Sequence, residues 1–147
     1  MKHATKLFLC ILLFTYCAST GTREFTQFGE SRIINSGYIK VFQATTDYLI
    51  EGGYKFTKTD MKTGEIETDY KLGVGWGSTR ASGEKRAKIR AKVIQVDENQ
   101  TRLVLEIFSE ARQPPSVWHE APMDASETVL AKRMYNRFFE FISRNVQ

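Results

Sequence analysis

Cysteine is scarce in this chain of 147 residues, and its placement is informative. The two cysteines, Cys10 and Cys17, both lie within residues 1–19, and the rest of the sequence has none. Residues 20–147 therefore contain no disulfide, thiolate nucleophile or cysteine-based metal site. A domain of this size can fold without disulfides. These absences exclude thiol enzymes and cysteine-ligated zinc modules.

Histidine, excess charge and long apolar runs are also scarce. His119 is the one histidine outside residues 1–19, so we interpret it as an ordinary loop residue rather than a metal ligand or general base. The formal net charge of +4 falls to +2 without Lys2 and Lys6, which excludes the basic excess of a nucleic-acid binder. No run after residue 19 approaches the ~20 apolar residues of a transmembrane helix.

The first nineteen residues have the three parts of a secretory signal peptide. Lys2 and Lys6 give a positive start, and residues 7–16 form an apolar run. Cleavage after Ser19 leaves Cys17 and Ser19 at the two positions where signal peptidase requires small residues. We therefore predict that residues 1–19 are removed and that the mature chain is exported to the periplasm or secreted.

Cys17 opens a second route of processing, as a candidate lipidation site. A bacterial lipoprotein is cut just before a cysteine that is then acylated, and Cys17 ends the apolar run. Tyr16 occupies a position that normally holds a small residue, which favours removal of Cys17 with the leader. Residues 20–35 are polar and resemble a tether, which favours acylation. The sequence predicts a soluble exported domain, with an outer-membrane-anchored lipoprotein as the alternative.

Residues 36–147 are predicted to form a single α+β domain that begins and ends with a helix. The first helix is expected to start at Ser36, as its cap, and to stop at the glycines 52 and 53. Asp124 and Glu127 have the spacing of a capping box for the last helix. The apolar stripe of that helix is Leu130, Met134, Phe138, Phe141 and Ile142.

Four strands are expected between the two helices. Residues 54–59, 65–72, 86–93 and 102–110 alternate apolar and polar side chains, which is typical of strands with one covered and one wet face. Turns at 60–64 and 97–100 join two pairs of them. The order α-β-β-β-β-α predicts a four-stranded antiparallel sheet with both helices on one face.

The third predicted strand carries a basic row that could bind phosphate, lipid head groups or an acidic partner. The row consists of Arg86, Lys88, Arg90 and Lys92. The alternative is pairing with acids of the neighbouring strands, worth ~0.2–1 kcal/mol for each pair. Those acids are Glu65, Glu67, Asp69, Glu106 and Glu110. We expect pairing to dominate, and we treat the row, with Trp76 of the glycine-rich connection, as a candidate binding face.

A helix that opens with VFQA at 41–44 and ends with LIEGGY at 49–54 is followed by strands at 56–60 and 64–68. This succession resembles small bacterial envelope lipoproteins with BamC-like domains, and the order of elements is similar over residues 36–145. The resemblance implies helices packed on a short antiparallel sheet, and it implies no catalytic residues.

Two functions are expected from these features. The first is a non-enzymatic exported envelope protein that binds another protein or an envelope polymer, with no cofactor and no nucleic acid. The second is a carrier of a small apolar ligand held between the helices and the sheet. An apolar pocket with a few convergent polar groups would favour the carrier, and a filled core would favour the binding module.

Overall fold

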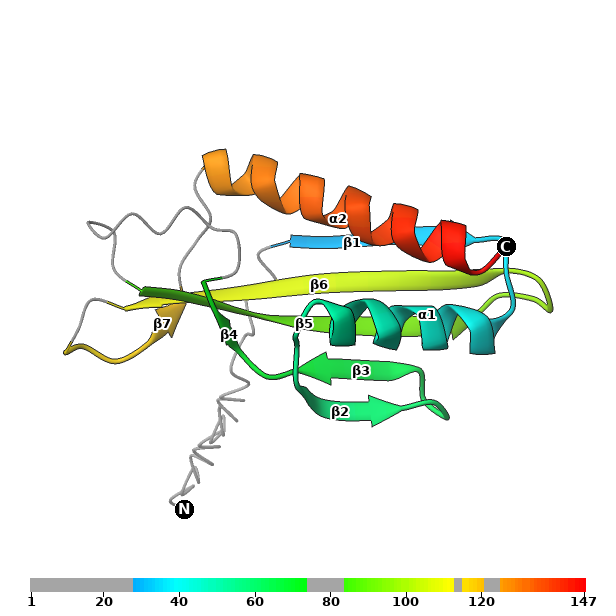
Figure 1. Ribbon diagram of the computed structural model, residues 1–147, viewed down its shortest axis with the longest axis horizontal. Coiled ribbons are helices and arrows are strands. Elements are labelled where there is room, and N and C mark those ends of the chain that lie inside the picture. Colours follow the sequence, from blue (N-terminus) through cyan, green and yellow to red (C-terminus); the bar gives the residue numbers. More distant parts are fainter. Residues whose placement is uncertain (1–27, 74–83, 113–114, 121–124) are drawn as a thin grey trace, which may run out of the picture.

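The computed structural model describes residues 28–73, 84–112, 115–120 and 125–147. These residues form an antiparallel sheet and two helices, which is the α+β class predicted from the sequence (Figure 1). The leader, Cys17 and Trp76 lie outside the described residues. Neither helix among the described residues is long and apolar enough to cross a membrane.

The sheet has seven strands among the described residues, in the order β1-β6-β5-β3-β2, with β4 beside β5 and β7 beside β6. Their bounds are β1 Phe28–Ile34, β2 Phe56–Asp60, β3 Glu65–Thr68, β4 Lys71–Leu72, β5 Glu84–Gln95, β6 Thr101–Arg112 and β7 His119–Glu120. The hairpin of β5 and β6 pairs over twelve residues on each strand and forms the middle of the sheet.

The prediction of four strands was wrong, and so was the tether for residues 28–34. This segment forms β1, an edge strand that pairs with β6. The sequence showed no strand period here because Arg32, a charged residue, occupies a position on the covered face of the sheet. Its side chain contacts α2. The guanidinium of Arg32 lies 4.6 Å from the ring centre of Phe139 and donates a 2.6 Å hydrogen bond to Asn136. At the edge of a sheet, a long charged side chain can cover apolar surface while its end reaches water.

The predicted strand 65–72 is broken after Thr68, and its alternation reverses. Ile66 and Thr68 are buried as expected. Beyond the break, Lys71 pairs with Ala87 on the helix side, and Tyr70 lies on the opposite face against Arg86. The interruption therefore brings a lysine to the covered face of the sheet.

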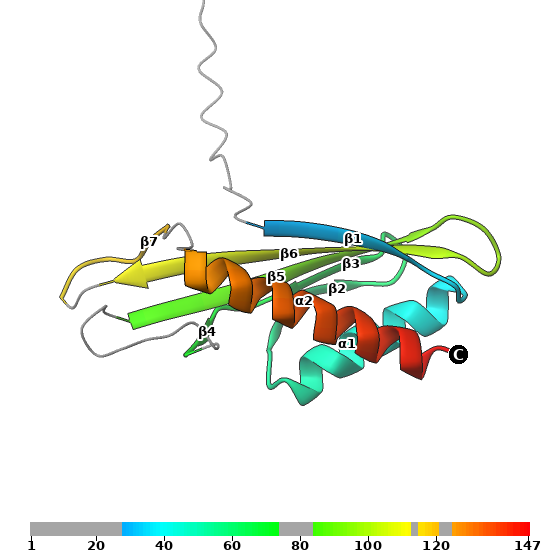
Figure 2. The same cartoon turned by 90° about the horizontal axis from the view of Figure 1, so that it is seen from above.

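Two helices, α1 Tyr38–Glu51 and α2 Ala125–Asn145, pack on the same face of the sheet (Figure 2). The predicted glycine stop of α1 is confirmed, because Gly52 is the C-cap and Gly53 follows with φ +71°. The predicted cap by Ser36 was wrong. Gly37 is the N-cap, and the Ser36 hydroxyl instead donates a 2.9 Å hydrogen bond to the carbonyl of Val146.

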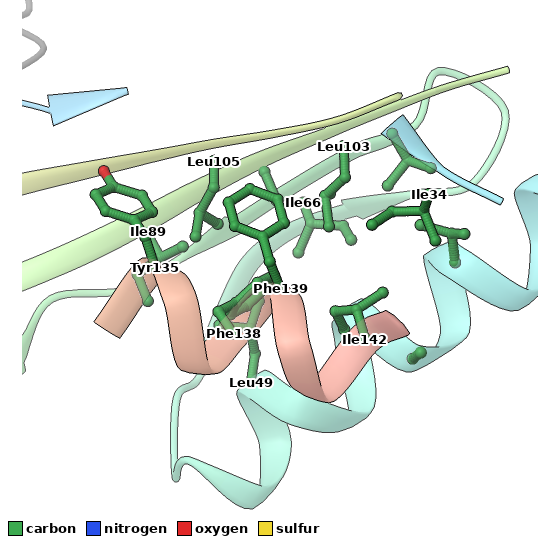
Figure 3. Packing of buried hydrophobic residues seen from close by; sticks show 14 of the residues in the cluster. Ile34, Leu49, Ile66, Ile89, Leu103, Leu105, Tyr135, Phe138, Phe139 and Ile142 are labelled. Carbon is green, nitrogen blue, oxygen red and sulfur yellow. The ribbon is translucent and has the colours of Figure 1, made fainter. Parts of the chain in front are cut away.

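The core lies between the helices and the covered face of β5 and β6 (Figure 3). Phe138 and Ile142 of the predicted α2 stripe are buried. Tyr135 and Phe139 are equally buried, so the buried face of α2 is wider than the predicted stripe. The extra width arises because α2 contacts α1 as well as the sheet. The other members of the predicted stripe, Leu130, Met134 and Phe141, are half-buried.

Candidate functional site

A cavity of about 420 Å³ lies between the helices and the sheet, beside the C-terminal end of α1. Its inner lining is apolar and comes from three elements. The lining residues are Ile89 of β5, Leu105 and Ile107 of β6, and Met134 and Phe138 of α2. The volume falls within the roughly 300–1,000 Å³ that is usual for small-molecule sites.

The cavity exists because α1 is short relative to the sheet. Helix α1 ends at Glu51, and the glycines at 52 and 53 turn the chain back toward β2. Figure 1 shows β5 and β6 running past this end of α1 toward β4 and β7. Helix α1 therefore does not cover this part of the sheet, and only α2 passes above it.

Polar groups gather where the lining meets the surface. Tyr48 and Glu51 come from α1, Tyr54 follows its glycine stop, and Lys71 comes from β4. The Lys71 ammonium donates a hydrogen bond to the carbonyl oxygen of Gly52 and lies 5.0 Å from the ring centre of Tyr54. The strand is interrupted after Thr68, and this interruption places the Lys71 side chain on the covered face of the sheet.

Both tyrosine hydroxyls at the cavity are neutral near pH 7 and can donate hydrogen bonds. Burial raises the pKa of Tyr48, and burial with a smaller contribution from Tyr48 raises the pKa of Tyr54 to about 12. The ring of Tyr48 is held edge-on against Phe138, with 4.6 Å between the ring centres. Neither hydroxyl has a hydrogen-bond partner among the described residues.

A second depression, of about 670 Å³, lies at the opposite end of α1. It is bordered by the start of α1, the turn between β5 and β6, and the last residues of the chain. Polar side chains such as Asn35, Lys40, Gln95, Glu98 and Asn99 make up much of its lining, and most of them are exposed. It lacks the apolar interior of the first cavity, so we take the first as the candidate site.

The basic row lies on the face of the sheet away from the helices, and its predicted pairing with acids is confirmed. Arg86 contacts Glu110 at 2.6 Å, Lys88 contacts Glu67 at 2.9 Å, and Lys92 contacts Glu65 at 2.9 Å. Arg90 lies 3.5 Å from Glu67. Hydrogen bonds from Lys58 and then Lys92 lower the pKa of Glu65 to about 2. The role of the row as a binding face stays a prediction.

Sequence reasoning missed the aromatic side chains that separate these charges. Phe108, on the same face, is only 6% exposed because Lys88 and Arg90 lie over its ring at 5.3 and 5.0 Å. The Arg86 guanidinium lies 4.3 Å from the ring centres of both Tyr70 and Trp118. The sequence does carry a signal for this layer, because Phe108 is an aromatic residue on the otherwise polar face of its strand. This face is therefore a packed layer of stacked cations and rings.

His119, interpreted from the sequence as a loop residue, lies on β7 and is exposed. It pairs with Ala111 of β6 through the short ladder at the end of the sheet. Within the described ranges, no three side chains of histidine, cysteine, aspartate or glutamate come close enough together to hold a metal ion.

No family model matches the chain, and no curated protein is significantly similar to it. Solved structures are similar in fold. A TBP-like protein from Parabacteroides distasonis is 8% identical, with a TM-score of 0.50 over 82% of this chain and 93% of that one. A conserved protein from Geobacillus kaustophilus is 11% identical, with a TM-score of 0.47 over 80% of this chain and 93% of that one. The similarity to the Parabacteroides protein concerns the fold alone. The resemblance to BamC-like domains stays a prediction.

Proposed function

We propose that this chain is a non-enzymatic exported protein that carries a small, mainly apolar ligand in the cavity between α1, α2 and the sheet. The observation that supports this proposal is the apolar floor formed by Ile89, Leu105, Ile107 and Phe138, beneath about 420 Å³ of space that opens to solvent. A space of this size that opens at polar residues is suited to a ligand.

Binding to another protein or to an envelope polymer through the basic row has less support. The acids Glu65, Glu67 and Glu110 already meet the cations of that row. An anionic partner would have to displace these acids, because they already balance the charge of the row. The cavity requires no such exchange.

The test is binding of N-phenylnaphthylamine, an uncharged probe that fluoresces in apolar surroundings, by two matched variants. Leu105→Phe places a larger side chain in the cavity lining, and we expect it to abolish probe binding while the protein remains folded. Leu103→Phe makes the same change two residues away on the same strand and face, at a fully buried position outside the lining. It should cost about 1–3 kcal/mol of stability through overpacking and leave the probe affinity of the folded protein unchanged.

The comparison between the two variants decides the proposal. Probe binding by wild type and by Leu103→Phe, with none by Leu105→Phe, supports a ligand in the cavity. Equal binding by both variants would place the probe elsewhere, and failure of the wild type to bind would remove the support for a carrier. Thermal unfolding of each variant shows which samples are folded.

Export makes its own prediction about the mature N-terminus. We expect the chain recovered from the cell envelope or medium to begin at Thr20, because Tyr16 is a poor fit to the lipoprotein peptidase. Intact-mass spectrometry measures this directly. A diacylglyceryl-modified Cys17 as the first residue would contradict the soluble form and would place the domain on a membrane. An uncleaved Met1 would contradict export.

A further inference from the structure

We propose that the ligand of this cavity carries an anionic head group, as a medium-chain monocarboxylate does, and that Lys71, Tyr48 and Tyr54 bind the head. This inference rests on the proposed function and adds the chemical class of the ligand. It follows from the kind of polar group that the cavity presents, because hydrogen-bond donors dominate over acceptors there.

Lys71 is the only cation that lines the cavity among the described residues. Its ammonium group donates to the carbonyl of Gly52 at the end of α1. An ammonium group has three donors, so this bond leaves donors for a ligand. Lys71 is itself half-buried, and the contact with the Tyr54 ring fixes its position. A positive charge held in this way at an apolar cavity attracts an anion and disfavours a cationic head group.

Tyr48 and Tyr54 add two donors that line the same cavity. Both phenols are protonated near pH 7, since burial raises a pKa that is already about 10, and their hydroxyls have no hydrogen-bond partner among the described residues. A carboxylate can accept several hydrogen bonds, and it enters an apolar site at acceptable cost only when they are supplied. Two phenols and an ammonium group meet this need. An alcohol or an amine would use fewer of these donors.

Glu51 is the one carboxylate at the cavity within the described ranges, and it is the feature that would favour a cationic ligand. Its side chain is exposed, in the last turn of α1. Water screens an exposed charge more strongly than a half-buried one. Because Lys71 is half-buried and Glu51 is exposed, the charge of Lys71 sets the preferred sign of the ligand.

The experiment compares decanoate, decanol and decylamine as competitors for bound N-phenylnaphthylamine. The three have the same apolar chain and differ only in the head group. We expect wild type to bind decanoate at least about tenfold more tightly than decanol, which is the scale of one or more hydrogen bonds to a charged group, and decylamine most weakly. In Lys71→Met the decanoate advantage should disappear while decanol binds as before. Lys62→Met, at an exposed turn lysine outside the cavity, is the matched control and should behave as wild type.

Tyr54→Phe removes one hydroxyl and no packing, so it tests the same inference if Lys71→Met fails to fold. It should weaken decanoate roughly threefold or more and leave decanol and the melting temperature nearly unchanged. A purely structural role for this hydroxyl would lower the melting temperature instead. Equal affinity of wild type for decanoate and decanol, or a decanoate advantage that survives Lys71→Met, would overturn the inference and leave the carrier intact. Failure of the probe itself to bind wild type would overturn both.

Discussion

Replacing Phe138 with alanine should lower the free energy of unfolding by about 3–5 kcal/mol. The side chain is 2% exposed and lies close to Phe139 (Figure 3), and its ring also packs against Tyr48. Removal loses the burial of an aromatic ring and joins the new space to the existing cavity. It also removes one of the two ring contacts between Tyr48 of α1 and helix α2. Chemical denaturation of the mature domain measures the loss.

Phe141→Ala is the matched control for this prediction. Phe141 lies three residues later on α2 and also contacts the Tyr48 ring, at 5.0 Å, but it is only half-buried. The alanine variant should lose less than half as much stability as Phe138→Ala. Equal losses, or a loss near zero at Phe138, would show that the inner face of α2 is not packed as described.

Gly64→Ala should be nearly as damaging as the loss of a core aromatic. Gly64 has φ +75°, a conformation that costs an alanine about 1–2 kcal/mol. An added Cβ would lie 2.0 Å from the carbonyl oxygen of Val93, so β5 would have to move. The same glycine accepts a 2.8 Å hydrogen bond from the Val93 amide, which this movement would break. We expect a total loss of about 2–5 kcal/mol when overpacking is added to the backbone cost.

Gly73→Ala separates the two contributions. Gly73 also has a positive φ, of +68°, but an added Cβ would meet nothing within 4 Å among the atoms of the described structure. It should cost only the ~1–2 kcal/mol of the backbone conformation. Urea unfolding of the two variants gives the comparison. If Gly64→Ala proved no less stable than Gly73→Ala, the close approach of the β2–β3 turn to β5 would be contradicted.

The elements predicted well from the sequence are those with one dominant period. Strands β5 and β6 alternate apolar and charged residues over most of their length, and each charged face found its partners on the neighbouring strand. The end of α1 was equally well predicted, because the glycines at 52 and 53 stop a helix without any help from tertiary contacts. Local chemistry decides these features, so a single sequence is enough to predict them.

The elements that were missed depend on neighbours distant in the chain. Strand β1 places Glu30 and Arg32 on the side that faces α2, and its order comes from pairing with β6, more than 65 residues later. The two-residue strands β4 and β7 are too short to show any period. Ser36 bonds to the carbonyl of Val146 rather than capping α1. Nothing in the local sequence indicates either partner.

The candidate cavity belongs to the same class of features. Tyr48, Tyr54 and Phe138 were identified as aromatics that suit a ligand or a core, and the sequence alone did not separate these uses. Whether these aromatics line a cavity or fill a core depends on where α1 ends relative to the sheet, and the packing of the whole domain decides this. Lys71 was assigned to the wet face of a continuous strand, and only the break after Thr68 brings it to the cavity.

The most direct test of the carrier proposal is a nuclear Overhauser experiment on methyl-labelled protein with decanoate bound. We expect contacts from the alkyl chain of decanoate to the methyl groups of Ile89, Leu105 and Ile107, which line the cavity. The methyl groups of Leu103 and Val93, in the filled part of the same core, should show none. Contacts confined to exposed residues such as Ile33 and Ile94, or no contacts at saturating decanoate, would contradict a ligand between the helices and the sheet.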